Sequence, residues 1–318
     1  MITWKLSAGT AGVIGRKTVK NQTPPTTAYI MLGENCRNAC SFCTQAKGNQ
    51  ANNSYLSRIT WPGYEAEVVR KDITGALEGQ QFKRVCLQVV NSEDGWKRTV
   101  ESLRLLTETN SKPICVSSHF DSIEQAKVLF KAGAERICLA LDAATPPLYR
   151  HIKGGDWQER WSLLTQCAVD FPGSVTTHLI VGLGETEEEM VDRIALCVEK
   201  GITVGLFAFT PVRGTALEKK APPGLGRYRR LQIAHYLLKL GFNRESIVCA
   251  NGVITGYEAP DWRSLLKDGK AFETSGCPDC NRPYYNERPG AVPYNYPRPL
   301  TSEEIAAALE KSRIGGVG

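Results

Sequence analysis

The 318-residue chain has no long apolar run and no block of like charge, and these absences exclude several classes of protein. No window approaches the ~18 apolar residues of a membrane-spanning helix, so we expect no membrane segment. The start lacks a basic stretch followed by an unbroken apolar one, so we expect no secretory signal and a cytoplasmic location. No Lys- or Arg-rich run marks a nucleic-acid site, and the net charge of +6 favours acidic partners only weakly.

Histidine is also scarce, whereas cysteine is abundant. The four histidines show no metal-ligand spacing, so a histidine-rich metal site is not expected. Eleven cysteines are an odd number scattered along the chain, which does not fit the disulfide framework of a small secreted protein. Metal or redox chemistry in a reducing compartment is the better interpretation.

Short β-branched segments alternate with longer amphipathic ones from Thr26 onward. Seven such segments run from "TTAYIML" to "ESIVCANGVI", separated by helical patterns such as residues 187–200. Strand–helix alternation with apolar strands predicts a parallel sheet covered by helices. Seven strands in one run favour an α/β fold of the TIM-like (β/α) barrel type, with an open doubly wound sheet as the alternative.

The chain divides by composition into three parts. Residues 1–25 are rich in Gly, Thr and Lys and are predicted to form an extended arm, and residues 26–265 form the barrel. Residues 266–318 form a C-terminal tail, rich in Pro and Tyr, that carries a C-x2-C pair and ends in a helix capped by Ser302. Its prolines exclude a long helix, so the tail should wrap the barrel as irregular chain and dock against its mouth.

The densest cysteine pattern is C-x3-C-x2-C, formed by Cys36, Cys40 and Cys43 directly after the first predicted strand. In a (β/α) barrel this position lies at the carboxyl end of a strand, where active sites gather. A structural zinc site and a full iron–sulfur cube each need four ligands, so three thiolates leave one position for another group. A structural zinc site or a simple electron-transfer cluster is the alternative.

With Phe42 preceding Cys43, the triplet resembles the C-x3-C-x-aromatic-C signature of the radical S-adenosylmethionine (SAM) superfamily. The resemblance implies a 4Fe–4S cluster on Cys36, Cys40 and Cys43 whose open iron binds SAM, with Phe42 among the cofactor-binding residues. It also implies a one-electron cleavage of SAM to a 5′-deoxyadenosyl radical, which removes hydrogen from an unactivated carbon.

Later segments resemble the biotin-synthase-like branch of that superfamily. "LALDAATPPLYRHI" and the following "DWQERW" are similar to a segment of that branch in which an Asp bonds the SAM ribose and an Arg holds its carboxylate. These positions are Asp142 and Arg160 here, and a guanidinium suits bidentate carboxylate binding. "HLIVGLGET" resembles the strand that lies along the adenine, which makes Ile180 a cofactor-binding candidate.

Biotin synthases hold a second cluster inside the barrel, and Cys86 and Cys115 occupy matching strand positions. At the third matching position this chain has Thr176, a departure that argues against a biotin-type second cluster. Cys138 is a reserve ligand, because it shares a strand face with Asp142. Cys249 is a weaker candidate, and Cys167 and Cys197 are expected to be buried apolar fillers.

The tail supplies Cys277 and Cys280 in "GCPDC". On spacing alone this is half of a zinc knuckle, but no second C-x2-C completes one. The block "CPDCNRPYYNERPG", together with the biotin-synthase-like barrel, resembles one subunit of the two-component lipoyl synthases, the one acting at C6. The resemblance implies a second 4Fe–4S cluster on Cys277 and Cys280 with two barrel cysteines, most simply Cys86 and Cys115.

The function implied is sulfur insertion at C6 of a protein-bound octanoyl-lysine, with the auxiliary cluster as sulfur donor. The implied partners are an octanoylated lipoyl-carrier protein (H protein or E2 lipoyl domain), a second lipoyl synthase subunit and a reductant protein. One alternative is a biotin-synthase-like or other radical SAM enzyme acting on a free small molecule. An alternative of another class is a non-catalytic iron–sulfur or zinc protein that senses redox state or scaffolds cluster assembly.

Overall fold

An eight-stranded, mostly parallel sheet organises the molecule, for which a computed structural model describes residues 2–20, 23–287 and 290–314. The strand order is β10-β9-β8-β7-β6-β2-β1-β5, and the first six of these strands run parallel to one another. They are β2 (Thr27–Leu32), β6 (Arg84–Val89), β7 (Ile114–Ser117), β8 (Arg136–Cys138), β9 (Val175–Val181) and β10 (Thr203–Ala208). The predicted α/β architecture with a parallel sheet is therefore confirmed for these segments.

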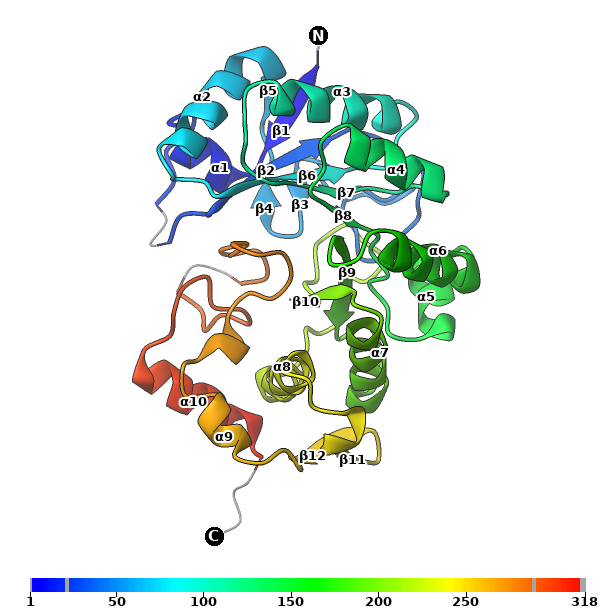
Figure 1. Cartoon of the computed structure of the whole chain (residues 1–318), viewed down its shortest axis with the longest axis vertical. Coiled ribbons are helices and arrows are strands. Elements are labelled where there is room, and N and C mark those ends of the chain that lie inside the picture. The colour runs from blue at the N-terminus through cyan, green and yellow to red at the C-terminus, as the bar shows by residue number, and fades with distance from the viewer. Residues whose placement is uncertain (1, 21–22, 288–289, 315–318) are drawn as a thin grey trace.

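The sheet does not close on itself through strand pairing. Among the described residues no backbone ladder joins β10 to the opposite edge, so closure of the predicted barrel is not detected. The C-terminal tail contacts the free edge of β10 instead. The Leu206 N–H donates to Ser275 Oγ over 2.9 Å, and Asn286 Nδ2 donates to the Ala208 carbonyl over 2.7 Å. Figure 1 shows the tail in orange, on the inner side of the sheet opposite β2.

The seventh predicted strand is wrong. Residues 247–257 form a separate antiparallel hairpin of β11 (Ile247–Ala250) and β12 (Val253–Tyr257). Its turn is Asn251-Gly252, and both residues have positive φ, at 51° and 76°. An Asn-Gly pair is the strongest short-range hairpin signal, because both central residues of the turn need a left-handed backbone.

The extended arm predicted for residues 1–25 is also wrong for much of its length. Strand β1 (Thr3–Leu6) pairs antiparallel with β2 and with β5 (Gly63–Glu65), and helix α1 (Ala8–Val13) follows, capped by Ser7. Trp4 and Leu6 are fully buried, so apolar side chains at alternate positions anchor this strand to the sheet. Residues 1, 21 and 22 of the predicted arm lie outside the described residues.

Helices cover the outer face of the sheet, as Figure 1 shows for α2, α3 and α4. Several begin at a side-chain cap, such as Ser122, Thr145, Asp156 and Thr186. The final helix is capped by Thr301 rather than by the predicted Ser302, and Glu304 completes its capping box. The remaining elements are α2 (Ala66–Glu78), α3 (Gly95–Thr107), α4 (Ile123–Lys131), α5 (Pro146–Lys153), α6 (Trp157–Asp170), α7 (Glu187–Glu199), α8 (Leu225–Lys239), α9 (Trp262–Leu265), α10 (Ser302–Ser312), η1 (Arg244–Ser246), η2 (Lys270–Phe272), β3 (Tyr55–Leu56) and β4 (Ile59–Thr60).

The main core packs between sheet and helices, and it includes Cys167 and Cys197, both fully buried. A second, smaller apolar cluster consists of Tyr29, Met31, Trp61 and Val90 and is called the inner cluster below. It combines inward-facing residues of β2 with the β3–β4 hairpin and its flank. No helix among the described residues is long and apolar enough to cross a membrane.

Candidate active site

The cysteine triplet lies in the loop after β2, as predicted, and backbone N–H groups face its sulfurs. The Asn38 N–H donates to Cys36 Sγ and the Gln45 N–H to Cys43 Sγ, each over 3.4 Å. Burial raises the pKa of Cys40 to about 11 and that of Cys43 to about 12, which favours neutral thiols until a cation is bound. Three half-buried thiols with amide donors are a donor set that fits the three-cysteine cluster implied by the motif.

A cavity of about 610 Å³ opens beside the triplet at the carboxyl ends of the strands. It is lined by all of the residues predicted to bind SAM, namely Phe42, Asp142, Arg160 and Ile180, together with the three cysteines of the triplet. The fold thus brings together residues that are up to 144 positions apart, counted from Cys36 to Ile180. Their individual roles in binding remain predictions.

Asp142 occupies a special backbone position, and Lys153 holds its side chain. Its φ is +64°, and it bridges to β9 by a bond from its N–H to the His178 carbonyl over 2.8 Å. Lys153 Nζ donates to Asp142 Oδ2 over 2.7 Å and to the Ala140 carbonyl over 2.6 Å. Burial opposes the charge of Lys153, yet the Asp142 carboxylate leaves its pKa above the usual value. Sequence reasoning missed Lys153, because a lone lysine at the end of a helix carries no motif.

Arg160 is held by the loop after β7. Its guanidinium donates to the Phe120 carbonyl over 2.6 Å, pairs with Asp121 Oδ1 at 3.1 Å and lies 3.2 Å from His119 Nε2. Burial, reinforced by the Arg160 charge, lowers the pKa of His119, which favours the neutral imidazole. No sequence pattern marks this contact, because residues 119–121 match no motif.

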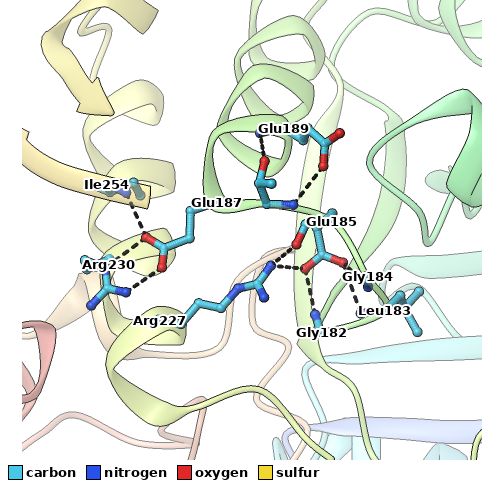
Figure 2. A network of polar contacts seen from close by, with 10 residues as sticks. Gly182, Leu183, Gly184, Glu185, Glu187, Glu189, Arg227, Arg230 and Ile254 are labelled. Atoms are coloured by element: carbon cyan, nitrogen blue, oxygen red, sulfur yellow. Dashed lines mark hydrogen bonds and ion pairs between the residues drawn. The ribbon is translucent and has the colours of Figure 1, made fainter. Parts of the chain in front are cut away.

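The loop after β9, part of the segment predicted to lie along adenine, is fixed by one carboxylate. Glu185 accepts bonds from the N–H groups of Gly182, Leu183 and Gly184 and pairs with Arg227 (Figure 2). The two glycines have φ of 102° and 147°, values that other residues rarely adopt. Next along the chain, Glu187 pairs with Arg230 and accepts from the Ile254 N–H, which ties α7 to α8 and β12 (Figure 2).

The tail cysteines lie at the opposite end of the strands from the triplet, whereas Tyr285 and Asn286 of the tail reach the main cavity at the carboxyl ends, so docking at the mouth applies to only part of the tail. Thr26, which precedes β2, bonds to the Asp279 carbonyl and Asn281, and Arg84 at the start of β6 donates to the Pro278 carbonyl. These contacts place the C-x2-C pair at the amino ends of β2 and β6. These hydrogen bonds hold the C-x2-C pair at that end of the strands, and no sequence motif marks the residues that form them.

Cys277 and Cys280 approach the predicted barrel cysteines. The sulfurs of Cys115 and Cys277 are 3.5 Å apart, and Cys86 is the ladder neighbour of Cys115. A hydrogen bond from the Cys115 thiol, aided by the charge of Arg84, lowers the pKa of Cys277 to about 6. These four cysteines and Cys138 are called the inner thiol group below.

Cys138 is buried on β8, and its pKa is raised by burial to about 12. Thr176 Oγ1 donates to the Ile137 carbonyl over 3.1 Å, so the residue at the third biotin-type position is a satisfied buried hydroxyl. Cys249 lies on the separate β11–β12 hairpin, where Arg244 is its neighbour. It therefore stands apart from the inner thiol group.

Buried arginines surround the inner thiol group, a feature that the sequence alone did not reveal. Arg84 is 2% exposed and pairs with Glu135, and Arg136 forms an ion pair with the same carboxylate. Arg282 donates to the Ser275 carbonyl over 2.7 Å and stacks 4.1 Å from the centre of the Phe207 ring. Buried cations of this kind compensate the negative charge of thiolates or of an anionic cluster. Within the described ranges, no three or more His, Cys, Asp and Glu side chains are arranged to hold a single metal ion.

Comparison with known families matches residues 30–197 to the family model described as the Radical SAM superfamily. The lipoyl synthase of Haemophilus ducreyi is 25% identical over 246 residues, covering 74% of this chain and 69% of that protein. The biotin synthase of a Hydrogenobaculum species is 28% identical over 196 residues, covering 59% and 56%. Alignments with curated relatives span between 47% and 69% of those proteins. The crystal structure of methylornithine synthase aligns with a TM-score of 0.55 and 21% identity over 68% of this chain and 63% of that one, a likeness of fold.

Proposed function

This chain belongs to the radical SAM superfamily, and we propose that it inserts sulfur at C6 of an octanoyl chain carried on a protein lysine. The observation that carries the proposal is the position of two sets of thiols at opposite ends of one interior. The triplet lies at the carboxyl ends of the strands, and the inner thiol group lies toward their amino ends. Between them, the inner cluster packs against Cys36 on one side and against Cys86 and Cys280 on the other.

The residues of the main cavity would hold SAM. When bound to Cys36, Cys40 and Cys43, the 4Fe–4S cluster supplies the electron that cleaves SAM to a 5′-deoxyadenosyl radical. Lys153 contacts Asp142 Oδ2, so Oδ1 can accept bonds from ribose hydroxyls. Arg160 faces the cavity and would bind the SAM carboxylate, exchanging its contact with exposed Asp121.

The inner thiol group would hold the sulfur source. Cys277 and Cys280, with Cys86 and Cys115, supply the four thiolates that a second 4Fe–4S cluster requires, with Cys138 in reserve. When bound, that cluster supplies the sulfide that replaces hydrogen on the substrate carbon. Arg84, Arg136 and Arg282 would offset its negative charge. The inner cluster excludes water from the space between the two sites, which protects a carbon radical from side reactions.

Partners follow from the same proposal. The substrate is an octanoylated lipoyl-carrier protein, a second lipoyl synthase subunit completes the paired insertion, and a reductant protein provides electrons. The basic surface, with a net charge of +6, suits an acidic carrier domain.

The test is a Cys277→Ala, Cys280→Ala double variant, reconstituted anaerobically and compared with Cys249→Ala as the control. The unmodified chain should bind about eight irons and the double variant about four, because one cube is lost. The double variant should still form 5′-deoxyadenosine but transfer no sulfur to an octanoyl-lysyl protein. Retention of both full iron content and sulfur transfer in the double variant would refute the proposal, whereas the control should behave like the unmodified chain.

The second candidate is a biotin-synthase-like enzyme acting on a free small molecule, favoured by the similarity to biotin synthases. Thr176 speaks against a biotin-type second cluster, because its hydroxyl is already bonded to a carbonyl. Assaying the reconstituted protein with free and with protein-bound substrates separates the two candidates.

A further inference from the structure

A second cavity, of about 310 Å³, opens on the flank of the barrel and is called the side cavity here. It lies between the start of α1, the β3–β4 hairpin and tail residues 282–287. Its lining is mostly apolar or aromatic, with Val19, Tyr29, Ile59, Trp61, Pro283 and Tyr285 as the main contributors. Its volume lies at the lower end of the range of ligand pockets, about 300–1,000 Å³, which suits a slender ligand.

The side cavity leads toward both sets of thiols. The Tyr29 hydroxyl, in its wall, lies 3.2 Å from Cys280 Sγ in the inner thiol group. Tyr285 lines both the side cavity and the main cavity that contains the triplet. Ser57 Oγ, at the tip of the hairpin, donates to the Tyr285 carbonyl over 2.8 Å. Hairpin and tail therefore meet at Tyr285, the residue that lines both cavities.

The main cavity offers a less suitable route for an apolar chain. Its lining includes charged groups such as Arg37, Lys153, Asp156 and Glu159. Passing a hydrocarbon chain along these groups would strip water from charges without replacing it. The side cavity has fewer charged groups, which are Arg58, Arg282 and Glu287, and the rest of its lining is mostly apolar or aromatic. Arg58 is exposed, so an acidic carrier could contact it.

We infer that the side cavity binds the acyl chain of the substrate: a linear chain of about eight carbons, amide-linked to a lysine of a carrier protein. The inference rests on the proposed function and deepens it, because it names the entrance and the chemistry that selects the chain. The acyl end passes Tyr285 toward the space between the two thiol sets, and the lysine stays outside near Arg58. Burial of each further methylene should strengthen binding roughly fourfold until the cavity is filled.

Equilibrium binding of acyl-lysyl peptides to the cluster-loaded protein tests the inference. The probes are peptides with four-, six- and eight-carbon acyl chains, and SAM binding is measured in parallel. Val19→Trp, with Ile59→Trp as a second variant, fills the side cavity, whereas Val128→Trp adds the same bulk on the exposed face of α4 as a control. Both filled variants should bind the octanoyl peptide at least about tenfold more weakly, the loss expected when roughly two methylenes are displaced. Their SAM affinity and iron content should match the control.

Two outcomes overturn the inference and are distinguishable. If the unmodified protein binds octanoyl peptide with the expected dependence on chain length but both filled variants bind it as the control does, the side cavity is not the entrance. The proposed function then stands. If the unmodified, SAM-competent protein shows no preference for the octanoyl peptide over the shortest one, the octanoyl-lysyl assignment fails and the inference fails with it.

Discussion

Replacing Lys153 by Met should cost the protein both stability and SAM affinity, because it leaves the Asp142 carboxylate without its cation. The two side chains are only 13% and 12% exposed, and their charged atoms are 2.7 Å apart. Met keeps most of the aliphatic stem of Lys and removes the ammonium. The perturbation therefore removes the ion pair together with the other contacts of the ammonium, which donates to the Ala140 carbonyl and lies 5.5 Å from the centre of the Tyr149 ring.

The magnitude follows from the burial of the pair. Removing one partner of a buried ion pair typically lowers the free energy of unfolding by about 3–5 kcal/mol, because the other charge is left uncompensated. Asp142→Asn should cost a similar amount by stranding Lys153. The double variant should cost clearly less than the two single losses combined, since neither charge is then present. The sum of the two single losses minus the loss in the double variant is the coupling free energy between Lys153 and Asp142.

Urea unfolding of the four proteins at neutral pH measures this coupling, and SAM binding to the cluster-loaded forms measures its functional effect. Lys153→Met should weaken SAM binding, because the Asp142 carboxylate loses the bond that orients it toward a ribose. The reasoning is refuted if the losses are additive within about 0.5 kcal/mol, the margin for independent sites.

Three further predictions concern other parts of the molecule. Arg160→Lys should weaken SAM binding about tenfold in a correctly folded protein, because an ammonium cannot reproduce the bidentate contact of a guanidinium with a carboxylate. Calorimetry measures the affinity, and unchanged binding would show that Arg160 does not bind SAM. Glu185→Ala should lower the free energy of unfolding by about 3–5 kcal/mol, since three backbone N–H groups lose their acceptor and Arg227 keeps only its bond to the carbonyl of residue 185, and chemical denaturation checks this. Burial lowers the pKa of His235 to about 3 in the folded protein. Below pH 6.5 the His235 imidazole is therefore protonated in the unfolded chain but not in the folded one, and the free energy of unfolding decreases as the pH is lowered. The loss should reach about 3 kcal/mol by about pH 4, and His235→Gln should lack this part of it.

The strands that the sequence predicted correctly share one property: each is rich in apolar and β-branched residues and stands in the alternation of short strand and longer helix patterns. Strand β1 has only four residues and alternates, so its burial of Trp4 and Leu6 depends on a distant partner, β2. The apolar content of residues 247–257 favours a barrel strand, but the Asn251-Gly252 turn folds them into the β11–β12 hairpin. At residues 247–257 the turn residues, rather than the apolar composition, determine the local structure.

The residues of the candidate site also fall into two groups, those that a sequence motif marks and those that no motif marks. Cys36, Asp142 and Arg160 stand in spaced motifs, and the fold brings them to one cavity. Lys153 and His119 contact those residues and line the same cavity, but no sequence motif marks either of them. A residue whose role is to hold another one is visible only when the fold has joined the two segments.

The position of the tail connects fold and proposed chemistry. Strand β10 ends the sheet, and an unpaired edge needs a cover. A proline-rich segment cannot form a ladder, so it covers this edge with single bonds from Ser275 and Asn286. Covering the edge in this way carries Cys277 and Arg282 inward, beside the cysteines of β6 and β7. The same segment therefore covers the edge of the sheet and delivers the thiols of the proposed second cluster, so a variant that loosens the tail should lose about four irons while it still cleaves SAM.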